Sequence, residues 1–295
     1  MPTGVVVPAY DYCGCWGGGG ELPLSVTTTE APGAHRRQTS DSTVSDTQLS
    51  RLRVYNLVMG LFHAVQAIAV LVLANDFALP VTATYQNGPP GSDNAELTTL
   101  FDLPTAWGVA AFLAISAVTH WTIASPGVVG WYGANLRFGR NSARWVEYSV
   151  SSSIMIVLIA QLTGINDVAT IVALFGVNAA MILFGWLQEV YEFPGSGGWL
   201  PFVFGCVAGV VPWLAIAIYL LSPGNPSDAS PPGFVYGIFV SLFVFFNVFA
   251  LNQWLQYRRV GRWRDYVFGE YVYVALSLVA KSALAWQVFA GTLAG

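Results

Sequence analysis

The sequence predicts an all-α membrane protein, a bundle of seven transmembrane helices. Of the 295 residues, 55% are hydrophobic and only 9% are charged, whereas a soluble domain carries about 25% charged residues. Seven apolar stretches are each long enough to cross the hydrocarbon core of a bilayer, which takes about 20 helical residues. The expected spans are 52–74, 103–123, 137–162, 168–190, 199–221, 234–257 and 266–293.

The third stretch becomes apolar only at Trp145. We therefore expect its first turns to lie in the membrane interface, where long basic side chains extend their charged ends toward water. The arginines expected to do so are Arg137, Arg140 and Arg144.

The arginines indicate how the chain crosses the membrane. All eleven lie in the N-terminal segment, in the loop after the second span or in the loop after the sixth. Cytoplasmic loops carry the excess of basic residues in membrane proteins. We therefore expect a multi-pass protein of the cell membrane with a cytoplasmic N-terminus and, after seven spans, an extracellular C-terminus.

Two segments outside the spans have distinct compositions. Residues 1–48 are rich in Gly, Thr, Ser and Pro, which predicts a disordered cytoplasmic tail ahead of a membrane domain at 49–295. Cys13 and Cys15 in this tail could together bind a metal, but a lone Cys-Gly-Cys in a flexible tail usually binds none, and we expect no metal site. The outer loop 75–102 carries β-branched residues on both sides of a turn at 87–91, which predicts a small β-hairpin capping the extracellular face.

One lysine and one glutamate are expected deep in the membrane. Lys281, the single lysine of the chain, lies about fifteen residues into the seventh span, and Glu147 about ten residues into the third. An ionisable group at the bilayer centre costs at least about 2.5 kcal/mol and is a functional hypothesis by default. The two spans run in the same direction, so the side chains have similar depths and can pair. A purely structural pair is the alternative, although apolar replacements of buried pairs are often as stable.

An amine buried beside a carboxylate can hold a carbonyl cofactor. Unlike a guanidinium group, the amine of Lys281 can lose its proton and attack an aldehyde to form a Schiff base. The aldehyde must be long and apolar to suit the membrane interior, and retinal meets both requirements. Glu147 is then the counterion that opposes desolvation of the protonated nitrogen. This hypothesis needs no catalytic residue and no metal.

Polar residues on four expected helices follow helical spacing, so each set shares one face. These residues are Asn56, His63 and Gln66 in the first span, Ser116 and His120 in the second, Glu147 and Ser151 in the third, and Glu270, Ser277 and Lys281 in the seventh. The four faces can converge on a hydrated cavity. Helix packing is the alternative role for the serines and amides, whereas the histidines favour a proton-linked role. Glu189 and Glu270 are expected at solvated helix ends.

The segments around both buried charges resemble the heliorhodopsins. The glutamate lies in Arg144-Trp-Val-Glu-Tyr-Ser-Val-Ser-Ser-Ser-Ile-Met155, and the lysine ends Glu270-Tyr-Val-Tyr-Val-Ala-Leu-Ser-Leu-Val-Ala-Lys281. The resemblance extends over all seven spans, from about Arg51 to the C-terminus. The expected topology is specific to this family, because other rhodopsins place the N-terminus outside.

The resemblance implies a rhodopsin-like bundle with all-trans retinal bound covalently to Lys281 and with Glu147 as sole counterion. Ser277 and Ser116 are implied beside the Schiff base, and Ser151 is assigned to the same site. The implied walls of the retinal pocket are Met155, Met181, Ile182, Gly185, Trp213, Phe246 and Asn247. The implied inner water cavity is bounded by His63, Gln66 and His120, and we assign Asn56 and Tyr148 to the same cavity. The resemblance also implies a homodimer with the outer hairpin and the fourth and fifth spans at the contact.

The favoured function is light sensing by a slow photocycle without ion pumping. In this hypothesis light isomerises retinal from all-trans to 13-cis, and the Schiff-base proton moves into the histidine-lined cavity. A light-gated or light-driven proton conductor is the first alternative, and a small-solute transporter that uses Lys281 as a fixed charge is the second. The expected partners are membrane lipid, a second copy of the chain and a signalling protein. We expect neither enzymatic activity nor binding of nucleic acid.

Overall fold

The structure, a computed structural model, describes residues 44–92, 95–221 and 230–294. Seven long helices lie in this part of the chain: α1 (Asp46–Leu73), α2 (Thr105–Ala124), α4 (Ser142–Leu162), α5 (Val168–Tyr191), α6 (Leu200–Leu221), α7 (Gly233–Tyr257) and α8 (Tyr266–Val288). A short π-helix, η2 (Phe289–Leu293), continues α8. All seven are long and apolar enough to cross a membrane, which confirms the predicted architecture.

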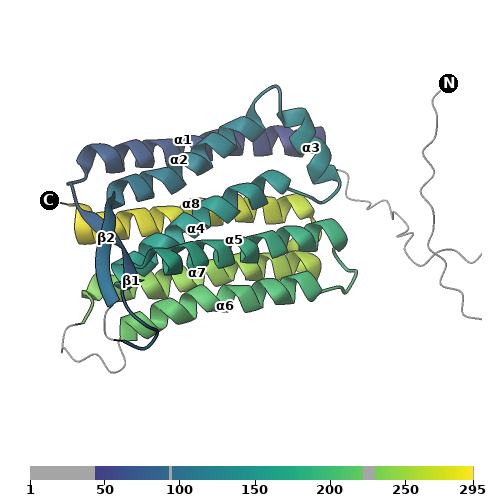
Figure 1. Ribbon diagram of the computed structural model, residues 1–295. Coiled ribbons are helices and arrows are strands. Elements are labelled where there is room, and N and C mark those ends of the chain that lie inside the picture. Colours follow the sequence, from purple (N-terminus) through teal and green to yellow (C-terminus); the bar gives the residue numbers. More distant parts are fainter. Residues whose placement is uncertain (1–43, 93–94, 222–229, 295) are drawn as a thin grey trace, which may run out of the picture. The chain divides into compact units, whose positions relative to one another are not determined.

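The seven helices run side by side and pack as one bundle (Figure 1). Consecutive helices in the order α1, α2, α4, α5 and α6 contact one another, and α8 contacts both α7 and α1. The rings of Trp213 and Phe239 join α6 to α7. α4 also contacts α6 and α7, and it is buried along most of its length. Polar groups on α4 can therefore be shielded from lipid on almost every side.

Local sequence sets where several helices begin. Ser45 caps α1 through a capping box with Gln48, and the side chains of Asp167 and Asp265 accept backbone N–H groups at the starts of α5 and α8. Such side chains satisfy N–H groups that have no partner in the first helical turn. α1 thus begins slightly ahead of the expected domain boundary at residue 49. Most of the expected tail, residues 1–43 with its two cysteines, lies outside the described residues.

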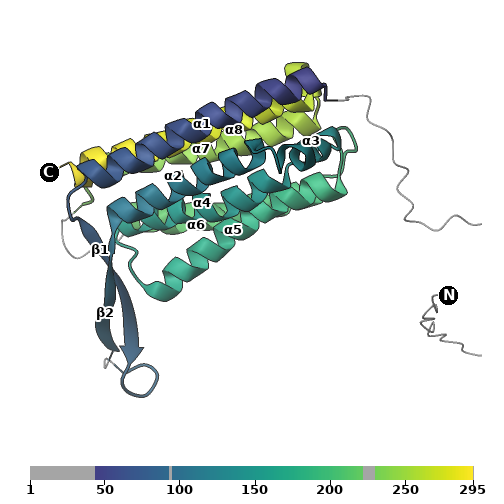
Figure 2. The same ribbon diagram turned by 90° about the horizontal axis from the view of Figure 1, so that it is seen from above.

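A β-hairpin connects α1 to α2 and confirms the predicted one. β1 (Ala78–Gln86) pairs antiparallel with β2 (Ala95–Pro104), with a shift of register between Val81 and Thr82. Thr82 N–H donates to Asn166 O at 2.8 Å, which ties the hairpin to the residues just before α5. The hairpin projects from the end of the bundle where the chain ends (Figures 1 and 2).

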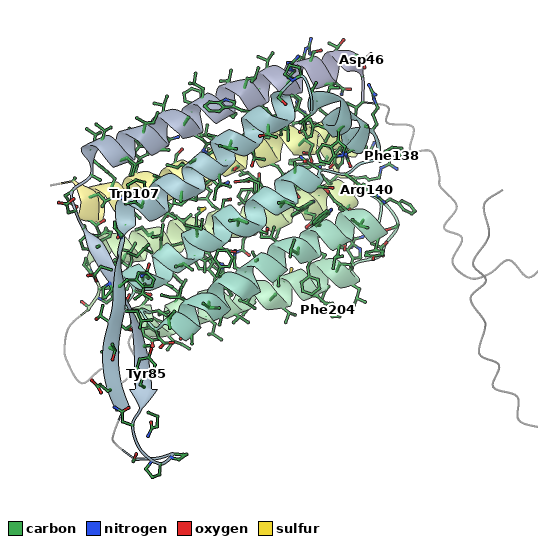
Figure 3. The ribbon with its side chains drawn as sticks, turned by 45° about the horizontal axis from the view of Figure 1, so that its top comes forward. Asp46, Tyr85, Trp107, Phe138, Arg140 and Phe204 are labelled. Atoms are coloured by element: carbon green, nitrogen blue, oxygen red, sulfur yellow. The ribbon has the colours of Figure 1, made fainter. Side chains whose placement is uncertain are left out.

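The third span begins five residues later than expected, at Ser142 instead of residue 137. A short helix, α3 (Val129–Arg137), is separate from α4, and Gly139 lies in the turn between them with a φ of +66°. Glycine adopts this left-handed conformation without steric cost. Arg140 is exposed at the end of the bundle away from Tyr85 of the hairpin (Figure 3). Arg144 does not reach water, because its side chain is only 4% exposed, so its expected position in the interface is wrong.

Candidate functional site

Lys281 and Glu147 face each other in the interior of the bundle. Lys281 Nζ donates to Glu147 Oε1 at 2.8 Å and to Ser277 Oγ at 2.9 Å. Ser116 Oγ donates to the same carboxylate oxygen at 2.6 Å. The charged side chains of Lys281 and Glu147 are 4% and 5% exposed. Four residues that the sequence analysis selected on three separate helices therefore lie within one hydrogen-bonded group.

Helical spacing and an aromatic ring hold this group in place. Ser277 precedes Lys281 by four residues on α8, so the two side chains lie on one face. Tyr148 follows Glu147 on α4, and its ring centroid is 5.0 Å from Lys281 Nζ, within the range of a cation–π contact. The Tyr148 hydroxyl donates to Tyr273 O at 2.9 Å, which fixes the ring against α8.

A cavity of about 280 Å³ reaches Lys281 from between α4, α5, α6 and α7. Its volume is close to the lower end of about 300 to 1,000 Å³ that is typical of ligand sites. It includes these residues expected at the cofactor site: Ser151, Met155, Met181, Ile182, Gly185, Trp213, Phe246, Asn247 and Ser277. Sequence reasoning missed further wall residues, among them Trp145, Phe202, Gly205, Gly209, Phe243, Phe249 and Tyr273.

The cavity walls fit a long apolar ligand. The Trp213 ring packs edge-to-face against Phe243 and Phe246, with ring centroids 5.4 and 5.3 Å apart. A Cβ atom at Gly185 would lie 2.5 Å from the Trp145 ring, so glycine lets this indole lie close to α5. The cavity therefore combines aromatic walls with one amine, and the paired carboxylate lies beside that amine just outside the cavity. These are the groups that a retinal-like aldehyde requires.

A second cavity, of about 20 Å³, lies on the Glu147 side of the pair and has room for about one water molecule. The residues expected there that line it are Asn56, Ser116, His120, Glu147 and Tyr148, and the structure adds Tyr132, Asn141 and Arg144. His120 Nδ1 lies 2.7 Å from Asn56 Oδ1.

Two residues expected in the water cavity do not line it. The ring of His63 stacks on that of His120 with centroids 5.6 Å apart, and His63 is fully buried. Neither ring nitrogen of His63 has a hydrogen-bond partner among the described residues. Gln66 is half-buried, and its Oε1 accepts from Trp286 Nε1 at 3.0 Å. His63 therefore adjoins the cavity through His120, whereas Gln66 is engaged elsewhere.

A second buried ion cluster was not expected. Arg144 forms ion pairs with Glu189 of α5 and Glu270 of α8, whose side chains are 2% and 0% exposed. The backbone N–H of Asn141 donates to Glu189 at 3.0 Å, and its side-chain amide donates to Glu270 at 2.6 Å. The expectation of solvated helix ends for both glutamates is therefore wrong. One signal was available, because Arg144 precedes Glu147 by three residues and shares its inward face of α4.

Comparison with known proteins assigns the family. A sequence model of the heliorhodopsin family matches residues 52–293, which span the bundle from the second turn of α1 through η2. A search of curated proteins found no match. The matched segment covers most of the chain and contains both buried ion clusters and both cavities. The chain therefore belongs to the heliorhodopsin family, which consists of retinal-binding, light-sensing rhodopsins.

Proposed function

We propose that this heliorhodopsin binds all-trans retinal covalently on Lys281, as a protonated Schiff base with Glu147 as its counterion, and that it signals light without pumping ions. The observation that carries the proposal is the 2.8 Å contact of Lys281 Nζ with Glu147 Oε1 beside an apolar cavity. Bound retinal would supply absorption of visible light and a change of shape on illumination.

The surrounding residues support this chemistry. Burial of Lys281 favours loss of its proton and so makes the amine a nucleophile. Glu147 stabilises positive charge on the same nitrogen, and Ser116 holds the carboxylate by donating to it. Ser277 accepts from the nitrogen and so directs it along α8. The aromatic walls exclude water from the remainder of the cavity.

The distribution of buried carboxylates favours a sensor over a pump. A proton on the Lys281 nitrogen can pass to Glu147 directly, and the small cavity connects Glu147 with His120. Outward transport needs a further acceptor and donor on opposite sides of the nitrogen. The buried carboxylates of the described residues are Glu147, Glu189 and Glu270. Glu189 and Glu270 lie toward the bundle end where α4 begins, so the described residues of the hairpin half offer no such relay.

The proposal is tested by reconstitution followed by electrical recording. All-trans retinal added to the expressed apoprotein should produce a visible absorption band that the Lys281→Ala variant lacks. Voltage-clamped cells that contain the coloured protein should show no light-evoked current. Reproducible currents would favour the proton-conductor alternative, and a colourless wild-type protein would favour the transporter.

We also propose a cytoplasmic N-terminus and a homodimer. Exposed arginines such as Arg140 lie at the bundle end away from the hairpin, as the positive-inside rule requires of a cytoplasmic face (Figure 3). The hairpin exposes large apolar side chains at Tyr85, Leu97 and Phe101, which suits burial against a second copy together with α5 and α6. Impermeant thiol labelling of a cysteine placed at Asn87, an exposed position in the hairpin turn, tests the orientation in intact cells. Leu97→Asp tests the dimer by its mass in detergent.

A further inference from the structure

The Arg144 cluster carries one more acidic group than its basic group can balance. Lys281 and Glu147 neutralise each other, whereas Arg144 faces both Glu189 and Glu270. Arginine keeps its charge in proteins, so two ionised carboxylates would leave one net negative charge buried. Such an uncompensated charge is costly inside a membrane protein. Binding of one proton by the cluster removes that cost.

No buried side chain of the described residues supplies the missing positive charge. The other titratable groups that face the cluster are tyrosines, namely Tyr132 of α3, Tyr148 of α4, Tyr257 of α7, and Tyr266 and Tyr273 of α8. Tyrosine is neutral at neutral pH, and burial raises the pKa of Tyr132, which lies outside the spans, still further. His120 lines the adjoining cavity but bonds to Asn56. The proton therefore belongs on a carboxyl group.

Both carboxyl groups of the cluster accept further hydrogen bonds among the described residues. Besides Arg144, Glu189 accepts from Asn141 N–H at 3.0 Å, Trp145 Nε1–H at 2.6 Å and the Tyr266 hydroxyl at 3.2 Å. Glu270 accepts from Arg144 and from the Asn141 side-chain amide. The orientation of that amide is fixed, because its oxygen accepts from the backbone N–H of Arg144 at 3.1 Å. Because both carboxyl groups face Arg144 and Asn141, the one proton belongs to the Glu189–Glu270 pair.

The cluster also adjoins the retinal counterion. Arg144 and Asn141 line the same small cavity as Glu147, with no other helix between them. Glu147 follows Arg144 by three residues on α4, and the cavity between them has room for about one water molecule. A change of charge on Glu147 therefore acts on the cluster over a short distance. The ion pairs of the cluster join α4, α5 and α8, so any change in them alters how these helices are held together.

We propose that Arg144, Glu189 and Glu270 form a second proton-binding site, in which the two carboxyl groups share one proton in the dark, and that this site senses the charge on Glu147. When Glu147 takes up a proton, its negative charge no longer favours protonation of the site, so the site holds its own proton less tightly. The proton site itself stands without retinal. Its response to light rests on the function proposed above.

Infrared spectroscopy of membranes that contain the retinal-free protein at neutral pH tests the proton site. Exposed carboxylates are ionised under these conditions, so the C=O stretch of a protonated carboxyl, identified by its shift in D₂O, reports buried groups. We expect this band in the wild type. Glu270→Gln and Glu189→Gln should each abolish it, because the one remaining carboxylate then balances Arg144. Arg144→Gln should about double the intensity of this band.

One further variant completes this arm. Glu192→Gln, at a partly exposed position just beyond α5, is the matched control and should leave the band unchanged. Absence of the band from the wild type, or its survival in both Gln variants, would overturn the site.

The second arm adds retinal and records the light-minus-dark infrared difference. The carboxyl band that both Gln variants remove should shift on illumination in the wild type and should not shift in Glu147→Gln, where no charge changes. A coloured, photoactive protein in which this band does not respond would overturn the coupling. A protein that stays colourless would defeat the proposed function, while the first arm would still decide the proton site.

Discussion

The two buried ion clusters lie one turn apart on α4 but differ in chemistry. The first pairs the Lys281 amine with one carboxylate, and the second pairs the Arg144 guanidinium with two. An amine can lose its proton and become a nucleophile, whereas a guanidinium group cannot. The first cluster adjoins an apolar cavity, while Arg144 Cζ lies 3.9 Å from the centroid of the Tyr273 ring. A buried charge therefore marks a cofactor site only where a reactive group has space beside it.

Exchange of the two basic residues is expected to have the largest effect. Lys281→Arg keeps a positive charge opposite Glu147 but removes the amine, so the visible band after addition of retinal should be lost completely. Arg144→Lys should keep the band, because the second cluster holds no cofactor. Absorption spectra of both variants, with size-exclusion profiles to check folding, measure this. A normal band in Lys281→Arg would contradict the distinction between the clusters.

Loss of the basic residue should cost more stability in the second cluster. Arg144→Ala removes the cation that joins α4 to both α5 and α8, and removal of one partner from a buried pair typically costs about 3–5 kcal/mol. Lys281→Ala breaks only the pair with Glu147, so its effect should be smaller. Thermal unfolding midpoints of both variants without retinal provide the comparison. Equal midpoints would show that the additional ion pair of Arg144 has no energetic consequence.

Removal of a single carboxylate should separate the clusters by colour. Glu147→Gln leaves the protonated Lys281 nitrogen without a counterion, so the band should move to longer wavelength. The visible band should disappear when the nitrogen loses its proton, and this should happen at a pH about 1 to 3 units lower than in the wild type. The reason is that a nearby opposite charge stabilises the protonated form. Glu189→Gln is the matched control and should change little both the wavelength of the band and the pH at which the band disappears. A spectrophotometric pH titration of each variant measures them, and similar curves would assign the counterion elsewhere.

Two glycines test the cavity wall with the smallest expected effect. A Cβ atom at Gly185 meets the Trp145 ring at 2.5 Å, and one at Gly209 meets the Met181 sulfur at 2.7 Å. The indole is rigid and bonded to Glu189, whereas methionine adapts its shape. Gly185→Ala should therefore lower retinal occupancy, and Gly209→Ala should alter it much less. The ratio of visible to protein absorbance after reconstitution gives the occupancy, and a larger loss in Gly209→Ala would contradict this description of the wall.

The fold and the first cluster could be predicted because their signals are local. Apolar runs of sufficient length mark the spans, and a single lysine inside one of them stands out without knowledge of any neighbour. The hairpin likewise followed from β-branched residues around a turn. The second cluster depends on the alignment of three helices. Glu189 near the end of α5 and Glu270 near the start of α8 resemble solvated helix ends until both meet Arg144.

Other details of the site depended on side-chain directions that periodicity does not define. Gln66 shares a helical face with His63, yet its side chain turns to Trp286.

The separate helix α3 was not predicted, because its residues adjoin an arginine-rich segment that resembled the start of a span. The resemblance to heliorhodopsins supplied the pocket walls, which composition alone could not distinguish from ordinary core.

The central claim is a covalent bond between Lys281 and retinal, and trapping that bond tests it most directly. The reconstituted protein is reduced with sodium borohydride and digested, and its peptides are analysed by mass spectrometry. The peptide that contains Lys281 should carry a retinyl group, and the Lys281→Arg variant should carry none on any peptide. A coloured wild-type protein whose Lys281 remains unmodified after reduction would contradict the account.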